Sequence, residues 1–142
     1  MSQCCDGIKN NRLPVLIQTV NSYSKEALLT AHQLKRLSLD SFCDIYISID
    51  EDCTGFSPPS GINLIMRGAG QCWSRDLDVS LAALNSEYVL FWLDDFVPTA
   101  IDEQRLRSIW QWFRSVKGDY IRLNPTPKGE GSLVHDGVRI IE

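Results

Sequence analysis

Residues 88–96 read Tyr-Val-Leu-Phe-Trp-Leu-Asp-Asp-Phe, in which six apolar residues precede two adjacent carboxylates, Asp94 and Asp95. A run this apolar is typical of a strand buried on both faces, so we expect a central strand here. The aspartates then fall where the strand leaves the core, and ligands of open α/β sheets bind at that edge. Because neighbouring carboxylates repel each other, a divalent cation or a donor-rich ligand would stabilise them. The alternative is that Asp94 and Asp95 only make a turn and cap the next helix.

Other strand patterns lie on either side of this segment. Residues 13–20, 43–50 and 62–66 are rich in β-branched and aliphatic side chains and predict three earlier strands. Residues 120–123 predict a fifth strand, and residues 134–141 predict a hairpin that turns at Asp136-Gly137.

Helical periodicity separates these strands. We expect helices over about 25–38, with Ser24 as N-cap, and over about 74–85. A third helix is expected to follow Thr99 as N-cap, with Asp102 in the capping-box position. The helices carry three apolar stripes: Ala27, Ala31, Leu34 and Leu37; Trp73, Leu77, Leu81 and Leu84; and Leu106, Ile109, Trp110, Phe113 and Val116.

The alternation of strands and helices predicts one α/β domain over residues 1–142, with residues 1–12 as a frayed tail. We expect a mostly parallel, Rossmann-like central sheet with helices on both faces, because right-handed crossovers connect parallel strands. Ordinary glycine and nucleophile motifs are missing from the sequence. There is no Gly-x-x-x-x-Gly-Lys loop, no Gly-x-Gly-x-x-Gly after the first strand and no Gly-x-Ser-x-Gly. A P-loop NTPase, an ordinary dinucleotide site and an acyl hydrolase are therefore disfavoured.

The composition of the chain disfavours nucleic-acid binding, membrane spanning and a disulfide framework. The net charge of −4 argues against nucleic acid as the main partner, because a phosphate backbone attracts a basic face. The apolar runs are far shorter than the roughly 20 residues that span a bilayer, and the polar start lacks a signal-peptide core. The five cysteines are odd in number and contain no Cys-x-x-Cys pair, so we expect neither a disulfide framework nor a zinc site. A cytoplasmic location is expected.

Four segments together resemble the nucleotide-sugar-binding half of a GT-A type glycosyltransferase. They are Gln-Thr-Val-Asn-Ser-Tyr at 18–23, Ile-Ser-Ile-Asp-Glu at 47–51, Gly-Gln-Cys-Trp-Ser-Arg-Asp-Leu at 70–77 and Leu-Asp-Asp-Phe at 93–96. The first segment is similar to the turn that lines the nucleotide pocket, and the second to the second strand with its acidic end. The third is similar to the start of the helix that precedes the acid motif, and the fourth to the metal-binding acid motif itself. The similarity extends from the first to the fifth expected strand, so the chain looks truncated after this half.

The resemblance implies a nucleotide-diphospho-sugar donor, an unknown acceptor and a Mn²⁺ or Mg²⁺ ion held by Asp95 and Asp94. It also implies that Thr19, Asn21 and Ser22 line the nucleotide pocket. Asp50 would contact the base or ribose, and Arg75 would face the phosphates. A divalent cation suits such a site because the leaving group is an anionic pyrophosphate.

Plainer interpretations of the same residues stay open. Asp50 heads an acidic run of the kind that is usually solvated, and Arg75 can pair with Asp78 on its own helix. Neighbouring side chains of a strand point to opposite faces, so only one of Asp94 and Asp95 reaches a metal unless the backbone turns there. The alternatives to a transferase are a non-catalytic or degenerate nucleotide(-sugar)-binding or interaction module of the same fold, and an unrelated α/β interaction protein.

Overall fold

The computed structural model describes residues 12–50, 55–70, 72–119, 121, 123, 133–135 and 138–140. The chain divides into two compact units, Met1–Ala100 and Ile101–Glu142. Of the tail expected over residues 1–12, all but Arg12 lies outside the described residues. Within the described ranges, no helix is both long enough and apolar enough to cross a bilayer.

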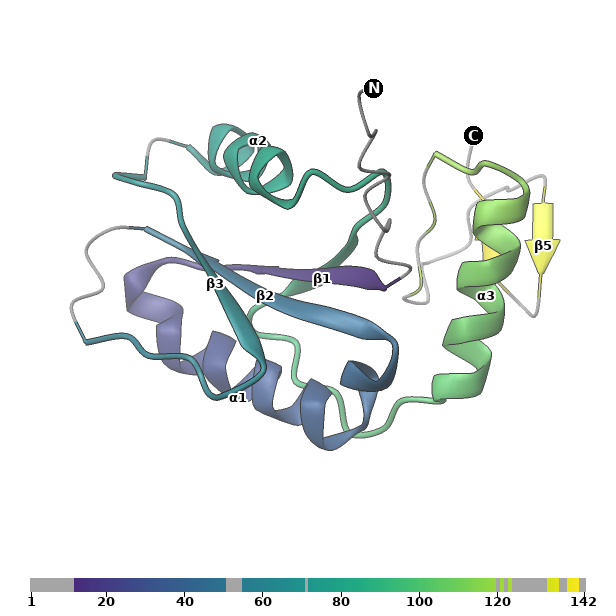
Figure 1. The fold of residues 1–142 in the computed structure, drawn as a ribbon, viewed down its shortest axis with the longest axis horizontal. Helices are drawn as coiled ribbons and strands as arrows, with labels where there is room; N and C mark the ends of the chain where they lie inside the picture. The colour runs from purple at the N-terminus through teal and green to yellow at the C-terminus, as the bar shows by residue number, and fades with distance from the viewer. Residues whose placement is uncertain are drawn as a thin grey trace, which may run out of the picture. The chain divides into compact units, whose positions relative to one another are not determined.

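The first unit is built on a parallel sheet, as predicted (Figure 1). Among the described residues, its strands are β1 (Leu13–Gln18), β2 (Cys43–Ile49), β3 (Ile62–Met66) and β4 (Leu90–Leu93). Their order is β3-β2-β1-β4, and every neighbouring pair is parallel. This is the order of the first four strands of a Rossmann sheet, so the α/β, Rossmann-like prediction is confirmed.

Helices cover both faces of this sheet (Figure 1). Helix α1 (Ser24–Arg36) lies on one face and α2 (Trp73–Leu84) on the other. The inner side of α1 is small and apolar, which lets the helix pack closely on the sheet. Its buried residues are Ala27, Thr30, Ala31 and Leu34.

Strand β1 forms the centre of the core because it pairs with β2 on one side and with β4 on the other. All six of its residues are buried, and β2 supplies the next largest buried set. The fully buried large side chains of the two strands are Val15, Leu16, Ile17, Ile45, Ile47 and Ile49. Because β1 is buried and paired on both sides, the end of this strand and the residues that directly follow it are held in position by the sheet.

The prediction of a central strand over residues 88–96 is wrong in position and length. Within the described residues, β4 covers only Leu90–Leu93 and lies at an edge of the sheet. Its residues are half-buried, and Leu93 is 51% exposed. Aromatic contacts account for part of the apolar run, since the ring of Phe91 packs edge-on against Trp73 at 5.8 Å between centroids. The apolar side chains of this segment therefore pack against rings such as Trp73, and their number does not show that the strand has a neighbour on each side.

Two predicted helix caps are wrong. Ser24 is the first residue of α1, directly after the short 3₁₀ turn η1 (Asn21–Tyr23), and no side-chain cap bond is present there. Helix α3 (Glu103–Ser115) has Asp102 as its N-cap instead of Thr99, since the Asp102 carboxylate accepts a hydrogen bond from the Arg105 amide at 3.0 Å. A carboxylate caps a helix directly, so Asp102 itself is the N-cap and the helix begins three residues later than the capping-box pattern predicts.

The predicted apolar stripe of α2 is also wrong in part. Trp73, expected in the core, is 59% exposed, and Leu81 is 39% exposed. The buried residue of this helix is Ser80, whose hydroxyl lies 2.6 Å from that of Ser48 on β2. A hydrogen-bonded serine pair therefore occupies the place where the periodicity predicted leucine packing.

The second unit contains α3 and a hairpin. Of the predicted stripe of α3, Ile109 and Phe113 are buried, whereas Val116, just after the helix, is 43% exposed. Strands β5 (Leu133–His135) and β6 (Val138–Ile140) pair antiparallel, which confirms the hairpin, while the expected turn residues 136–137 lie outside the described part. The predicted fifth strand over 120–123 is not found at Ile121 and Leu123, and its other two residues lie outside that part.

Candidate functional site

The carboxyl ends of the four parallel strands meet at one edge of the sheet. From β1 the chain runs outward to β2 and β3, and it then returns to add β4 on the opposite side of β1. The reversal makes the β1–β4 junction a topological switch point, which is where open α/β sheets bind ligands. Thr19 directly follows β1 at this point, and Asp94 directly follows β4.

Thr19 and Asp94 are in direct contact at the switch point. The Thr19 hydroxyl donates to Asp94 Oδ2 at 2.8 Å, and the Thr30 hydroxyl of α1 donates to the Asp94 carbonyl oxygen at 2.7 Å. Thr19 and Thr30 are buried, and Asp94 is half-buried. Two residues of the expected site, 75 positions apart in sequence, are thus brought together, and α1 fixes the backbone of Asp94.

Asp94 and Asp95 occupy a turn, so their side chains do not follow strand alternation. The Phe96 amide donates to the Leu93 carbonyl at 3.3 Å and closes the turn around the pair. Asp95 is exposed, and among the described residues its carboxylate has no hydrogen bond or ion pair. The interpretation as a turn holds, but neither aspartate caps α3. One carboxylate is held in place and the other faces solvent with both oxygens available.

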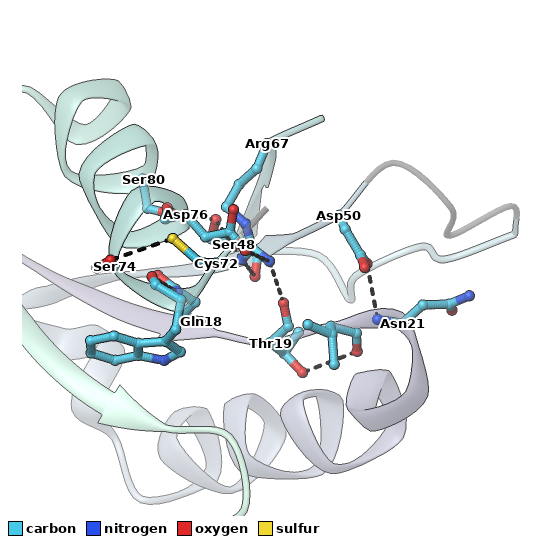
Figure 2. A network of polar contacts seen from close by, with 12 residues as sticks. Gln18, Thr19, Asn21, Ser48, Asp50, Arg67, Cys72, Ser74, Asp76 and Ser80 are labelled. Atoms are coloured by element: carbon cyan, nitrogen blue, oxygen red, sulfur yellow. Dashed lines mark hydrogen bonds and ion pairs between the residues drawn. The ribbon is translucent and has the colours of Figure 1, made fainter. Parts of the chain in front are cut away.

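Asn21 and Asp50 form a second contact at this edge (Figure 2). The Asn21 backbone N–H donates to Asp50 Oδ1 at 2.9 Å, and Asp50 is half-buried just beyond β2. The other Asp50 oxygen, Oδ2, would lie 4.0 Å from a Cβ atom added to Gly70, and Oδ2 of Asp76 would lie 3.5 Å from it. Two carboxylates therefore approach the same glycine. Ser22, also expected at the site, is exposed in η1.

Arg67 is a residue of this edge that the sequence reasoning missed (Figure 2). It follows β3, and only 1% of its side chain is exposed. Nη1 donates to the Ser48 carbonyl at 2.7 Å and Nη2 to the Thr19 carbonyl at 2.8 Å. Asp76 Oδ2 lies 3.7 Å from Nη2. The sequence could have indicated Arg67, because residues that follow parallel strands meet at the ligand-binding edge and Arg67 follows β3 as Asp94 follows β4.

Gln18, the last residue of β1, was expected only as part of the 18–23 segment and not as a site residue of its own. Its Nε2 donates to the Trp73 carbonyl at the start of α2 at 3.1 Å, which fixes the orientation of the amide. Its Oε1 is buried and has no hydrogen-bond donor among the described residues. The first turn of α2 is thus attached to the sheet edge through Gln18 as well as through Asp76.

The start of α2 also presents Cys72 and Arg75. Cys72 is exposed, and hydrogen bonds from the Ser74 hydroxyl and from the Arg75 backbone amide hold the pKa of its thiol below the ordinary value. Arg75 is exposed in the first turn of the helix. A helix N-terminus attracts negative charge, so an anion at this edge would find favourable backbone dipoles there.

The carboxylate oxygens at this edge are of the type that hard divalent cations prefer. Among the described residues, no three His, Cys, Asp or Glu side chains form a metal-binding group. Mg²⁺ commonly needs only one or two carboxylates, because waters and substrate phosphates complete its shell. Asp95, with support from Asp94, supplies ligands of that chemistry. No family model, curated protein or solved structure matches this chain.

Proposed function

We propose that the chain binds a nucleotide-diphospho-sugar with Mn²⁺ or Mg²⁺ at the carboxyl edge of its sheet and transfers the sugar to an acceptor. The observation that carries the proposal is the Thr19–Asp94 contact at the switch point, because it places the acid pair beside the segment that follows β1. The Asn21–Asp50 contact supports it, since it adds a further carboxylate to the edge that carries the acid pair.

In this proposal each residue has a distinct task. Asp95 and Asp94 would hold the cation, and Arg75 would face the pyrophosphate. The nucleotide pocket would be lined by Thr19, Asn21 and Ser22. Asp50 would accept hydrogen bonds from ribose hydroxyls or the base, because an ionised carboxylate only accepts hydrogen bonds. When bound, a divalent cation would neutralise the charge that develops on the departing pyrophosphate.

A second candidate is a non-catalytic nucleotide-sugar-binding module of the same fold. The carboxylates described at this edge are Asp50, Asp76, Asp94 and Asp95, and the first three already have a hydrogen bond or an ion pair. A general base must be within reach of the proton it removes and not committed to another partner. Of these four described carboxylates, Asp95 alone meets the second condition, and it is also the expected metal ligand.

Thermal unfolding with nucleotide sugars tests both candidates. UDP-glucose and GDP-mannose, each with Mn²⁺, are added at about 100 times a micromolar-range Kd, where binding contributes about 2.7 kcal/mol. For a domain of this size we expect the Tm to rise by roughly 5–10 °C. If neither sugar raises the Tm, with or without Mn²⁺, both candidates are wrong.

The Asp95→Asn variant isolates the metal. Because Asp95 is exposed, its replacement should change the stability of the free chain by less than about 0.5 kcal/mol. The Mn²⁺-dependent part of the Tm shift should disappear, and a variant that keeps that part excludes Asp95 as a ligand. Release of free nucleotide diphosphate from the bound sugar separates the two candidates, since the binding module shows the Tm shift without turnover.

A further inference from the structure

Two arginines bridge β1 and β2, one at each end of the sheet. At the amino end, Arg12 Nη2 donates to the carbonyls of Asp40 and Cys43, each at 2.6 Å. At the carboxyl end, Arg67 donates to the carbonyls of Ser48 and Thr19. Both side chains use the planar fork of the guanidinium group, which holds two acceptors in a fixed relation.

The two arginines differ in their surroundings. The Arg12 side chain is 37% exposed and forms a 2.6 Å ion pair with Asp44, whereas only 1% of the Arg67 side chain is exposed. The Arg67 Nε is buried and has no acceptor among the described residues, and the Arg67–Asp76 separation of 3.7 Å is long for a hydrogen bond. A buried charge that is incompletely paired is costly, so sheet stability alone does not account for Arg67.

The partners of Arg67 all belong to segments that present groups to the proposed ligand. The Thr19 carbonyl belongs to the residue whose hydroxyl holds Asp94. The Ser48 carbonyl lies two residues before Asp50, and Asp76 is in the first turn of α2. Figure 2 shows the Arg67 side chain directed into this group of residues. One guanidinium group therefore connects the ends of β1, β2 and the start of α2.

We infer that Arg67 is the positioning residue of this edge: it holds the ends of β1 and β2 and the first turn of α2 in the arrangement that receives a ligand. As a statement about nucleotide sugars, the inference rests on the proposed function. A lysine keeps the charge but has a single ammonium group on a flexible stem, so it does not fix two carbonyls at once. Loss of such preorganisation weakens binding without removing any group that touches the ligand.

Amide hydrogen exchange tests the positioning role without a ligand. Arg67→Lys should accelerate exchange at the amides of Thr19 and Asn21, which donate to Ser48 O and Asp50 Oδ1, by about tenfold or more. The matched control is Arg12→Lys, which should instead accelerate exchange at the Leu13 amide, bonded to Phe42 O. If Arg67→Lys leaves Thr19 and Asn21 unchanged, or if both variants affect them equally, the inference is wrong.

Affinity for UDP-glucose–Mn²⁺ and GDP-mannose–Mn²⁺ is the second readout. Arg67→Lys should raise the Kd of the sugar that binds by about tenfold or more, and Arg12→Lys should change it less than about twofold. Equal weakening by both variants overturns the positioning role and leaves the proposed function standing. If the natural chain binds neither sugar, the proposed function fails, and the exchange experiment still decides whether Arg67 positions the edge.

A second variant covers the case in which Arg67→Lys does not fold. Asp76→Asn keeps the shape of the side chain and removes the ion pair with Arg67. It should accelerate exchange at Thr19 and raise the Kd by roughly threefold or more, because the first turn of α2 is then held less firmly. Asp78→Asn is its control, since it makes the same change at an exposed residue of the same helix and leaves the Arg67–Asp76 ion pair intact. Equal effects of the two variants contradict the inference.

Discussion

Replacing Thr30 by valine tests whether α1 holds the acid pair in place. Thr30 is fully buried, and its hydroxyl donates to the Asp94 carbonyl oxygen at 2.7 Å. Valine has nearly the same shape, so the substitution removes the hydrogen bond without opening a cavity. Its added methyl group does not bond to the carbonyl, which then lies at the β4 turn with one donor fewer.

The expected loss of stability follows from two opposing terms. Deleting the hydrogen bond and leaving an acceptor unsatisfied costs about 1–3 kcal/mol, and the buried methyl group returns up to about 0.8 kcal/mol. The net loss is therefore about 1–2 kcal/mol, which corresponds to roughly 3–8 °C in Tm for a chain of this length.

A double-mutant cycle with Thr19→Val supplies the assay. Both hydroxyls bond to Asp94, one at the carbonyl and one at the carboxylate, so their effects on the free energy of unfolding should be non-additive by about 0.5–1 kcal/mol. Urea unfolding followed by tryptophan fluorescence measures each corner, with the exposed Ser22→Ala as a neutral control. A Thr30→Val chain within about 0.5 kcal/mol of the natural one, or strict additivity, would refute the reasoning.

Three further outcomes are expected. Because the Ser74 hydroxyl and the Arg75 backbone amide lower the pKa of Cys72, its thiolate forms at lower pH than that of an ordinary cysteine. The midpoint of iodoacetamide labelling, followed by peptide mass spectrometry, should therefore move upward in Ser74→Ala. Asp102→Ala should lower stability by about 1 kcal/mol in thermal unfolding, since it deletes the N-cap of α3. Gly118→Ala should cost about 1–3 kcal/mol in the same assay, because its methyl group would overlap the buried Phe113 ring, whereas Ser115→Ala on the exposed side should cost less.

Much of the first unit was predictable because its signals are local. The alternation in β2 and the short apolar run of β3 mark strands by period and length, and β3 was found with its predicted bounds of 62–66. Whether a strand lies at the centre or at the edge of the sheet is not predicted by such local signals, since it depends on pairing partners far away in sequence. The run at 88–96 is as apolar as β1, yet β1 has strands on both sides in the described sheet and β4 has one.

The candidate site was predictable where it uses side chains that follow strands. Asp94 was predicted by the rule that parallel strands present their carboxyl ends together, whereas Thr19, Asn21 and Asp50 were expected only from the resemblance to a transferase family. These four residues lie in two hydrogen-bonded pairs. Arg67 was missed because its main partners are backbone carbonyls, which every residue carries and which leave no trace in a sequence pattern.

The pairing of β1 has a consequence for the order in which the chain folds during synthesis. Leu13 pairs with Cys43, 30 positions later, and Val15 also pairs with Leu90, 75 positions later. The fully buried strand β1 therefore leaves the ribosome well before either neighbour exists, and long-range parallel pairing is slow to form. Until Leu93 has emerged, the apolar side chains of β1 lack a full set of strand neighbours and can aggregate or bind a chaperone. The speed of translation across residues 50–93 should therefore influence how much of the protein reaches its native state.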